Sequence, residues 1–307
     1  MTATPRVSIL LVTRDGMSTL PAVLDAIARQ RTSFDFELVA IDSGSSDGSR
    51  ELLSSRVDRL VEVRPRDFDH GETRNLGVEA CRGELVALLV QDAEPADEHW
   101  LEELTAPFDD PRVAGSYARQ LLRPDAGALT RHYLREWPAV ADEPHVREIE
   151  SREAFASWRP MERYLACVFD DVSSCIRRSA WREHRFPPSP IAEDVAWAKR
   201  VLLAGWRIAY APRARVVHSH ERGVRHEFAR TRVAHRRLAA LFDLRTIPSF
   251  PQLARAIGAS LWLHLRCVAG GPRGPHSRAA DLARAVGLAF AYPLGQYLGA
   301  RNARYEG

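Results

Sequence analysis

Unbroken runs of apolar residues, each ending in polar residues, recur along the first third of the chain. A run of this kind, rich in Val, Leu and Ile, is typical of a strand that is buried on both faces of a sheet. The runs that we interpret as strands are residues 7–13, 36–42, 59–63 and 85–90. Apolar residues at helical spacing lie between them and predict helices at residues 20–28, 50–55 and 73–81. Gly83 follows the last helix and is its expected C-cap.

This alternation of strands and helices predicts an α/β fold with a doubly wound, mainly parallel sheet that is flanked by helices. The same pattern continues more loosely, with an irregular stretch at residues 121–158. The later elements that we expect are a helix at 100–108, strands at 113–120 and 170–178, a helix from 191, and strands at 207–210 and 214–218. Ligands of such folds bind at the carboxyl ends of the strands, so the residues that follow each strand are the first candidates for a site.

Asp92 follows the strand predicted at residues 85–90, in the segment QDAEP. A carboxylate at the end of a buried strand is poorly solvated unless it meets a cation or a hydrogen-bond donor. A divalent metal such as Mg²⁺ or Mn²⁺ would satisfy it and leave room for phosphates. The alternative is structural, with Asp92 as the N-cap of the next helix and Pro95 as its first residue. The spacing alone does not decide between the two.

A second group of candidate residues, the segment DSGSSDG, begins with Asp42 at the end of the strand at residues 36–42. A carboxylate followed by small residues suits contacts to a nucleoside, because it accepts hydrogen bonds from a base N–H or from ribose hydroxyls. The alternative is an ordinary Asx-turn and helix cap. Gly44 and Gly48 form neither GxGxxG nor GxxxxGK[ST], so neither a dinucleotide fingerprint nor a P-loop is indicated.

Two polar pairs open predicted helices. Arg74 and Asn75 are placed to reach a diphosphate or a base edge, although such a pair is also common on a solvated helix face. Glu193 and Asp194 begin the helix predicted from residue 191, where the helix dipole stabilises negative charge. The functional interpretation of this acidic pair is a general base that faces the site.

His218 and His220 follow the strand predicted at residues 214–218. In a chain with carboxylates at strand ends, a histidine in this place is a candidate metal ligand. We expect the two side chains to point to opposite faces of the segment, so that at most one of them faces a shared site. His220 is favoured, because it lies further beyond the end of the strand.

After Gly223 the pattern changes to amphipathic helices rich in Arg. We expect helices at residues 226–244, 253–268 and 282–298, the last two separated by a Gly/Pro segment at 270–275. A basic amphipathic helix is typical of a segment that lies on an anionic membrane surface. Packing on the preceding domain or in a dimer is the alternative. The chain is therefore divided into a domain of residues 1–222 and a helical C-terminal extension of residues 223–307.

Composition narrows the class of protein. The formal net charge of +3 is too small to indicate binding to nucleic acid, and no such partner is expected. The four cysteines show no CxxC or Cys/His metal spacing, which indicates reduced thiols and a cytoplasmic location. The first residues lack the pattern of a secretory signal, and no stretch reaches the ~18 apolar residues of a membrane span. Any membrane contact is thus expected to be peripheral, at the inner face of the cell membrane.

With these residues assembled, the chain resembles the family 2 glycosyltransferases, which are inverting enzymes of the GT-A fold. Within that family it is most similar to the bacterial rhamnosyltransferase-like members. The segments that carry the resemblance are VSILLVTRDG, ELVAIDSGSSDGS, FDHGETRNLGVEACRGELVALLVQDAEP and AEDVAWAKRVLLAGWRIAYAPRARVVHSH. They span roughly residues 6–220 in the order of the family, and the C-terminal tail is only weakly typical of it.

The resemblance implies a role for residues that match the motifs of the family. Those implied to contact the nucleotide-sugar are Thr13, Asp15, Asp42, Ser43, Arg74, Asn75, Gln91 and Asp92. The metal-binding DxD motif of the family falls on Val90, Gln91 and Asp92, so that its second Asp is kept as Asp92 and its first is replaced by Val90. Asp194 of the acidic pair matches the catalytic base, and His220 or His218 completes the metal shell.

The chemistry implied is a single displacement with inversion. Asp194 takes the proton of an acceptor hydroxyl as that oxygen attacks the anomeric carbon of a nucleotide-diphospho-sugar. Mg²⁺ or Mn²⁺ on Asp92 neutralises the leaving diphosphate. By resemblance the favoured donor is dTDP-rhamnose, and the acceptor is a cell-surface polysaccharide or a lipid-linked glycan.

Two other classes of protein remain open at this point. One is a nucleotide-sugar-binding protein without transferase activity, in which Val90 has abolished the use of metal. The other is a nucleotidyltransferase, which shares a related sheet. A nucleotidyltransferase normally has a Gly-rich phosphate loop soon after the first strand, and the segment TRDG at residues 13–16 lacks one.

Overall fold

The computed structural model describes residues 4–271, 277–301 and 303–306 of the chain. Its contacts divide the chain into two compact units. Unit 1 comprises Met1–Leu121, Pro138–Ala156 and Ala166–His218, and unit 2 comprises Leu122–Trp137, Ser157–Leu165 and Ser219–Gly307. The functional division expected between residues 222 and 223 stays a prediction. Residues 272–275 of the predicted Gly/Pro segment lie outside the described residues.

Unit 1 is built on one mixed sheet, and the first half of that sheet is parallel. Its strands lie in the order β3 (Arg59–Glu62), β2 (Phe36–Asp42), β1 (Val7–Thr13) and β4 (Leu85–Val90). The strands predicted at residues 7–13, 36–42 and 85–90 are confirmed with the same boundaries. Each of them is buried over almost its whole length, which is why continuous apolar sequence marks them so clearly.

The second half of the sheet adds antiparallel pairs. β8 (Ser173–Arg177) lies antiparallel between β4 and β6 (Val113–Leu121), and β6 is parallel to β9 (Arg207–Val217). β9 also pairs antiparallel with β5 (Glu94–Pro95) and β7 (His145–Arg147). The predicted α/β fold with a helix-flanked, mainly parallel sheet is confirmed, and the antiparallel strands are confined to this half.

Two expectations about the strands were wrong, and the structural alternative given for Asp92 and Pro95 is excluded. The strands expected at residues 207–210 and 214–218 are the single strand β9, which ends at Val217 and in which a register shift opposite Ala118 and Arg119 accommodates Pro212 as a bulge. Pro95 does not start a helix, because β5 pairs with β9 there and the next helix begins at Trp100. The strand expected at residues 170–178 begins only at Ser173, after a turn.

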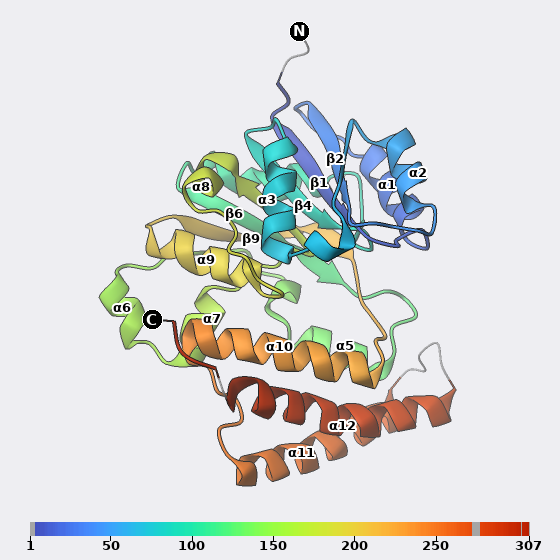
Figure 1. Ribbon diagram of the computed structural model, residues 1–307, viewed down its shortest axis with the longest axis vertical. Helices are drawn as coiled ribbons and strands as arrows, with labels where there is room; N and C mark the ends of the chain where they lie inside the picture. The colour runs from blue at the N-terminus through green and yellow to red at the C-terminus, as the bar shows by residue number, and fades with distance from the viewer. Residues whose placement is uncertain (1–3, 272–276, 302, 307) are drawn as a thin grey trace. The chain divides into compact units, whose positions relative to one another are not determined.

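Helices cover both faces of this sheet. Helices α1 (Leu20–Ala28), α2 (Ser49–Arg56) and α4 (Trp100–Thr105) share one apolar core with alternate residues of β1, β2 and β4. Helix α3 (His70–Ala80) lies on the opposite face, where a side chain at Gly77 would be 2.5 Å from Leu10 and 2.9 Å from Ile41. Figure 1 shows α3 in front of β1 and β4. Helix α9 (Glu193–Leu203) contacts α3 and β9.

Helix α3 corrects the expectation at residues 73–81. It begins at His70, because the side chain of Asp69 caps it by accepting from the backbone N–H of Glu72 at 3.1 Å. It ends at Ala80 with the backbone of Cys81 extended, so Gly83 is not its C-cap. Gly83 is instead required by a close approach, since a Cβ there would lie 2.6 Å from the backbone nitrogen of Ser8.

Unit 2 is helical. Its helices are α5 (Ala128–Arg135), most of α7 (Pro160–Ala166), α10 (Val224–Phe242), α11 (Phe250–Gly270) and α12 (Arg278–Arg301). Helix α12 contacts both α10 and α11 along its length (Figure 1). Gly299 permits a close approach, because a Cβ there would lie 2.3 Å from the carbonyl oxygen of Arg232. The three helices expected after Gly223 are thus confirmed, with different ends.

The remaining elements are short. They are η1 (Pro65–Asp67), η2 (Ala106–Asp109), η3 (Pro138–Val140), α6 (Arg152–Ser157) and α8 (Arg178–Glu183). The helix expected at residues 100–108 is divided between α4 and η2, which contains Pro107. Among the described helices, none combines the length and the apolar character that crossing a bilayer requires.

Candidate active site

Polar loops meet where β1, β2 and β4 end. The register aligns Thr13 of β1 with Asp42 of β2, and Val12 of β1 with Val90 of β4. Because these strands are parallel neighbours, the loops after them lie at the same edge of the sheet. The predicted site residues at the ends of β1, β2 and β4 are therefore close together, although they are up to about 80 positions apart in the sequence.

Gln91 fastens the loop after β1 to the end of β4. The backbone N–H of Arg14 donates to Gln91 Oε1 at 2.7 Å, and Gln91 Nε2 donates to the carbonyl oxygen of Arg14 at 2.9 Å. A Cβ at Gly16 would lie 2.6 Å from the same Oε1, so this contact needs a glycine there. The side chain of Gln91 thus holds the shape of the loop on which Thr13 and Asp15 lie.

Asp15 fastens the same loop to the loop after β2. Its backbone has φ = 46°, a left-handed conformation that is uncommon outside glycine. Asp15 Oδ1 accepts from the backbone N–H of Ser46 at 2.8 Å, and its own N–H donates to Ser45 Oγ at 2.8 Å. The carboxylate of Asp47 adds a third link by accepting from the N–H of Met17 at 2.9 Å.

Asp42 is buried and forms the Asx-turn that was the structural alternative for this segment. Its Oδ2 accepts from the N–H groups of Gly44 at 3.0 Å and Ser45 at 2.9 Å, and Ser45 Oγ donates to Oδ1. The hydroxyls of Thr13 and Ser43 lie beside it, buried and with no hydrogen-bond partner among the described residues. Buried polar groups are normally paired, so these unpaired hydroxyls mark a place where a ligand could bind.

Arg74 lies in a buried ion-pair network. Its Nε is 2.8 Å from Asp171 Oδ2, and its Nη1 is 2.8 Å from Glu193 Oε1. One buried guanidinium thereby balances two buried carboxylates, an arrangement in which loss of either partner leaves an uncompensated charge. Asp171 was missed from the sequence, where it lay in an expected strand. The only signal for it was the acidic dipeptide with Asp170.

Asn75 supports the loop that leads into α9. Its Oδ1 accepts from Trp181 Nε1 at 2.9 Å and from the N–H of Phe186 at 3.1 Å, and its Nδ2 donates to the carbonyl oxygen of Phe186 at 2.9 Å. These bonds explain why Asn75 is buried. The ion pairs of Arg74 and the hydrogen bonds of Asn75 give both residues a structural role. The contact with a nucleotide that was expected of them stays a prediction.

Asp194 lies in an environment that disfavours its charge. Burial raises the pKa of its carboxyl well above the ordinary range, and the negative charges of Glu193, Asp171 and Asp170 raise it further. Its Oδ1 accepts from the N–H of Val195 at 2.7 Å. A carboxylate with a raised pKa is a stronger base near neutral pH, which is what abstraction of a hydroxyl proton requires.

The chain enters α9 in a strained conformation. Ala192 has φ = 59° and ψ = 32°, a left-handed conformation that costs free energy for a residue with a Cβ. Strain of this kind gathers at functional sites. His70, which the sequence did not single out, lies 3.9 Å from Glu193 through its Nδ1. Burial lowers the pKa of His70, and the charge of Glu193 partly opposes that effect.

Asp92 and His218 form the core of a candidate metal site. Asp92 Oδ1 lies 3.7 Å from His218 Nε2 in unit 1, and both residues belong to a group of side chains able to hold a metal ion. A carboxylate oxygen and an imidazole nitrogen are suitable donors for Mn²⁺, and Mg²⁺ would rely more on the carboxylate. The donor set therefore fits the predicted metal.

The expectation that only one histidine can face the site was wrong. Residues i and i+2 of an extended segment lie on the same face, so His218 and His220 are not opposed. His218, which was the less favoured of the two, is the one that approaches Asp92 within unit 1. His220 belongs to unit 2, but two residues of chain keep its Cα within about 7 Å of that of His218. Its ligation stays a prediction.

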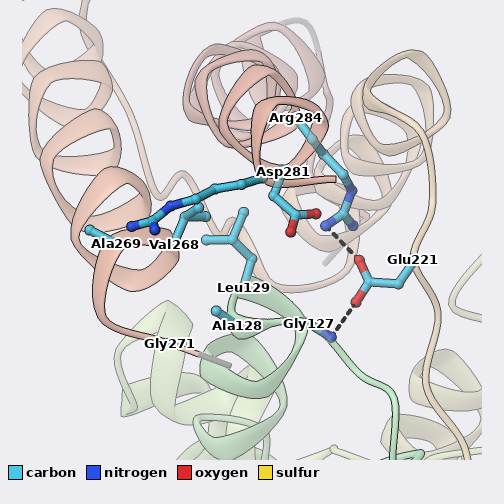
Figure 2. A pocket seen from close by; sticks show the side chains of 10 residues that line it. Gly127, Ala128, Leu129, Glu221, Val268, Ala269, Gly271, Asp281 and Arg284 are labelled. Atoms are coloured by element: carbon cyan, nitrogen blue, oxygen red, sulfur yellow. Dashed lines mark hydrogen bonds and ion pairs between the residues drawn. The ribbon is translucent and has the colours of Figure 1, made fainter. Parts of the chain in front are cut away.

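Unit 2 contains a separate hollow of about 80 Å³, which Figure 2 shows from close by. Glu221 lies at its side, where it accepts from the N–H of Gly127 at 2.9 Å and pairs with Arg284 at 2.7 Å. Glu221 thus connects Gly127, the residue before α5, to Arg284 of α12. None of the predicted site residues lines the hollow, so its shape gives no reason to place the active site there.

Comparison with known proteins identifies the family. The profile of glycosyl transferase family 2 matches residues 8–178, which is more than half of the chain. The chain belongs to glycosyltransferase family 2. It is 33% identical over 233 residues to O-antigen chain rhamnosyltransferase RfbN of Salmonella typhimurium, covering 73% of this chain and 70% of that protein. It is 30% identical over 207 residues to O-antigen chain rhamnosyltransferase WbaN of Salmonella anatum, covering 66% of this chain and 62% of that protein.

Solved structures share the fold. The mannosyltransferase PcManGT from Pyrobaculum calidifontis, in complex with GDP-Man and Mn²⁺, matches with a TM-score of 0.57 and 20% identity over 97% of this chain and 86% of that chain. S. aureus TarS 1–349 in complex with UDP-GlcNAc matches with a TM-score of 0.54 and 13% identity over 95% and 90%. At these identities the likeness shows the GT-A fold alone.

The family confirms the central prediction from the sequence. The protein is a glycosyltransferase of the hexosyltransferase class, and a nucleotide-sugar donor and a glycan acceptor are the partners of that activity. The alternatives of a non-catalytic binding protein and of a nucleotidyltransferase are set aside. Family membership does not fix the sugar, the stereochemistry, the metal or the roles of individual residues.

Proposed function

We propose that this protein transfers rhamnose from dTDP-rhamnose to a hydroxyl of a cell-surface polysaccharide or a lipid-linked glycan, with inversion at the anomeric carbon. The names of the relatives RfbN and WbaN, both O-antigen chain rhamnosyltransferases, support the sugar and the class of acceptor. The observation that carries the chemistry is the half-buried Asp194, whose pKa is raised by burial and by neighbouring carboxylates.

The proposed reaction is one displacement. Asp194 accepts the proton of the acceptor hydroxyl while the acceptor oxygen forms a bond to the anomeric carbon from the face opposite the diphosphate. The bond from that carbon to the diphosphate oxygen breaks, and its electron pair leaves with dTDP. The configuration inverts because only one displacement occurs. Glu193 is proposed to act through Arg74, since its carboxylate is buried in that ion pair.

The nucleoside is proposed to bind at the ends of β1 and β2. The buried, unpaired hydroxyls of Thr13 and Ser43 support this assignment, and Asp42 pairs with Thr13 in the register and precedes Ser43 in the chain. Asp15 and Gln91 are proposed to shape the same pocket through the loop contacts that they make.

The proposed metal ligands are Asp92, His218 and His220. A bound Mg²⁺ or Mn²⁺ would supply positive charge next to the leaving diphosphate. Val90 stands where the family's DxD motif has its first Asp, so this site has one carboxylate fewer than a complete DxD. The pair of Asp92 and His218 supports a site that uses imidazole in addition to the carboxylate.

The first prediction tests the assigned base. The change Asp194→Asn removes the proton acceptor but keeps the size of the side chain and its bond from Val195 N–H. We expect turnover of dTDP-rhamnose to fall about 10²–10⁴-fold, the usual contribution of a positioned base, with donor affinity unchanged. Product release is followed by chromatography, and the anomeric configuration of the product by NMR spectroscopy.

The matched control is Asp281→Asn, which makes the same substitution in the first turn of helix α12. It should leave turnover at the level of the parent. Turnover by Asp194→Asn equal to the parent would contradict the role of Asp194, and a retained anomeric configuration would contradict the single displacement. Turnover of UDP-glucose or GDP-mannose in preference to dTDP-rhamnose would replace the proposed donor.

Helix α11 supports the second part of the proposal, a peripheral contact with an anionic membrane surface. Its exposed apolar side chains include Phe250 and Trp262, which are 69% and 62% exposed. It carries Arg255 and Arg266 and contains neither Asp nor Glu. The guanidinium of Arg266 lies 5.1 Å from the centre of the Trp262 ring. Exposed aromatic residues beside arginines are typical of a helix that lies in the headgroup region of an anionic bilayer.

The second prediction concerns this helix. The double change Phe250→Ser and Trp262→Ser should abolish sedimentation of the protein with vesicles that contain phosphatidylglycerol. The parent should bind these vesicles and not vesicles of phosphatidylcholine alone. Val146→Ser, a change at a 57% exposed residue of β7, is the control that should bind like the parent. Equal binding to both kinds of vesicle, or a dimer in solution that the double change dissociates, would contradict the proposal.

A further inference from the structure

Three buried side chains form a hydrogen-bonded chain that leads to the proposed metal site. Gln120 lies near the end of β6, Asp170 lies in the turn before β8, and His218 follows β9. Their exposed fractions are 7%, 7% and 9%. Gln120 Nε2 donates to Asp170 Oδ2 at 2.6 Å, and Gln120 Oε1 lies 2.9 Å from His218 Nδ1. At the end of this hydrogen-bonded chain lies Asp92, 3.7 Å from the other ring nitrogen of His218.

The chemistry of these groups fixes where each proton lies. An ionised carboxylate can only accept, so the amide nitrogen of Gln120 must face Asp170. The amide oxygen of Gln120 then faces His218, and an amide oxygen can also only accept. His218 Nδ1 must therefore carry the proton of the neutral ring. Nε2 is left with its lone pair on the side of Asp92.

We infer that Gln120 is a positioning residue that holds His218 as the Nδ1–H tautomer, so that Nε2 is presented as a ligand beside Asp92. The inference rests on the proposed metal site and extends it to residues that no motif marks. A donated hydrogen bond from the second nitrogen of a ligating histidine fixes the tautomer and the orientation of the ring. The opposite tautomer would place a hydrogen on Nε2, where it would exclude a metal.

The backbone adds to this orientation. The N–H of His218 donates to the carbonyl oxygen of Leu121 at 2.9 Å, so the residue is tied to the strand on which Gln120 lies. The backbone N–H and the ring Nδ1 of His218 are thus both held by neighbouring residues of β6, Leu121 and Gln120. The ring needs no rearrangement to present Nε2, which lowers the entropic cost of binding a metal.

The tautomer is tested first, in the parent protein without metal. Long-range ¹H–¹⁵N NMR spectra distinguish the two neutral forms, and His218 is assigned by its absence from His218→Gln. We expect the Nδ1–H form. A predominant Nε2–H form would overturn the inference, and this measurement does not depend on the folding of any variant at Gln120 or on transferase activity.

Metal affinity is tested next with Gln120→Met, which keeps the length of the side chain but removes both hydrogen bonds. We expect the affinity for Mn²⁺, measured by EPR spectroscopy of the free ion, to fall about 10–100-fold, as is usual when such a partner is lost. His218 should also lose its preference for the Nδ1–H form. A merely structural role for Gln120 would leave the tautomer unchanged.

The matched control is Gln30→Met. The amide of Gln30 is also hydrogen-bonded, but not to His218. Its Nε2 donates to the carbonyl oxygens of Ala26 and Asp97, and its Oε1 accepts from the N–H of Leu101. This change should leave both the affinity for Mn²⁺ and the tautomer as in the parent. Unchanged affinity in Gln120→Met would overturn the inference. Absence of Mn²⁺ binding in the parent would instead overturn the proposed metal site, while the tautomer still reports on Gln120.

Discussion

At the scale of single residues, the proposed base is surrounded by groups that oppose its charge. Asp171 and Glu193 share the guanidinium of Arg74, and Asp194 lies next to them without an ion pair in that network. A carboxylate kept in such surroundings is well suited to take a proton, but its charged form destabilises the fold. Function and stability therefore make opposite demands on Asp194.

The third prediction follows from the sign of this pKa shift. The pKa of Asp194 is raised in the folded state above its unfolded value of about 3.9. The folded protein thus holds the proton more tightly, and the stability contributed by this group is fully present below the unfolded pKa and lost as the pH rises through the folded pKa. Asp194→Asn has no such loss, so its free energy of unfolding should increasingly exceed that of the parent as the pH rises.

The measurement is urea unfolding of parent and variant at several values between pH 4 and pH 8. The difference in free energy of unfolding between the two should grow with pH and level off once Asp194 is ionised. A difference that stays constant across this range would contradict the raised pKa. Asp281→Asn serves again as the control and should give a difference that does not follow this trend.

Single candidates could be found in the sequence because polar residues at strand ends and helix starts mark possible sites. Asp92 and Asp42 were found at strand ends, and Asp194 at the start of a helix. Their partners could not. Gln120 and Asp171 look like ordinary strand residues in the sequence, and they matter because the fold brings β6, β8 and α3 together. Pairing across such distances leaves no local pattern from which it could be inferred.

At the scale of elements, agreement was closest where burial alone decides the structure. β1, β2, β4 and α1 have the expected boundaries, since each is a continuous buried run or a strongly amphipathic helix. The errors lie where tertiary pairing overrides local signals. Glu94–Pro95 becomes a strand because β9 pairs with it, and Gly83 serves a close approach between backbones and not a helix end.

The fourth prediction tests the role of Gly83. In Gly83→Ala the new Cβ would meet the nitrogen of Ser8 at 2.6 Å and the carbonyl carbon of Val7 at 2.8 Å, and backbone cannot yield as a flexible side chain can. We expect a loss of about 1–3 kcal/mol in the free energy of unfolding, which is typical of overpacking. Gly258→Ala, a change in α11 with nothing within 4 Å of the new Cβ, should instead raise stability by about 0.5–1 kcal/mol.

Urea midpoints of the two variants and the parent decide this prediction. Equal midpoints for Gly83→Ala and the parent would show that β1 and the segment before β4 can separate at little cost. A C-cap role for Gly83 would predict a smaller loss, because the residue would need conformational freedom but not space.

At the scale of the whole molecule, the proposed site draws on loops after β1, β2 and β4, on the start of α9 and on the end of β9. These segments come from positions 13 to 218 of the chain, so the site exists only when unit 1 is folded. A ligand that binds there must therefore stabilise the folded state against the unfolded one. Because of this linkage, the donor can be identified without knowledge of the acceptor.

The fifth prediction uses that linkage. In thermal unfolding with a panel of nucleotide diphosphates and nucleotide-sugars, dTDP and dTDP-rhamnose should raise the Tm most, and Mn²⁺ or Mg²⁺ should increase the effect. A ligand at 100 times its Kd adds about 2.7 kcal/mol to the free energy of unfolding, so even a modest affinity is measurable. EDTA should return the Tm to the value seen with nucleotide alone.

The variant Asp92→Ala separates the parts of this effect, because it removes the proposed carboxylate ligand but none of the residues proposed to contact the nucleoside. It should keep the rise in Tm caused by dTDP and lose the further rise caused by Mn²⁺, whereas Asp281→Ala should keep both. A metal effect that persists in Asp92→Ala would place the metal elsewhere. A larger shift with UDP-sugars than with dTDP-rhamnose would keep the transferase and exchange its donor, since the fold of unit 1 does not depend on which base binds at the ends of β1 and β2.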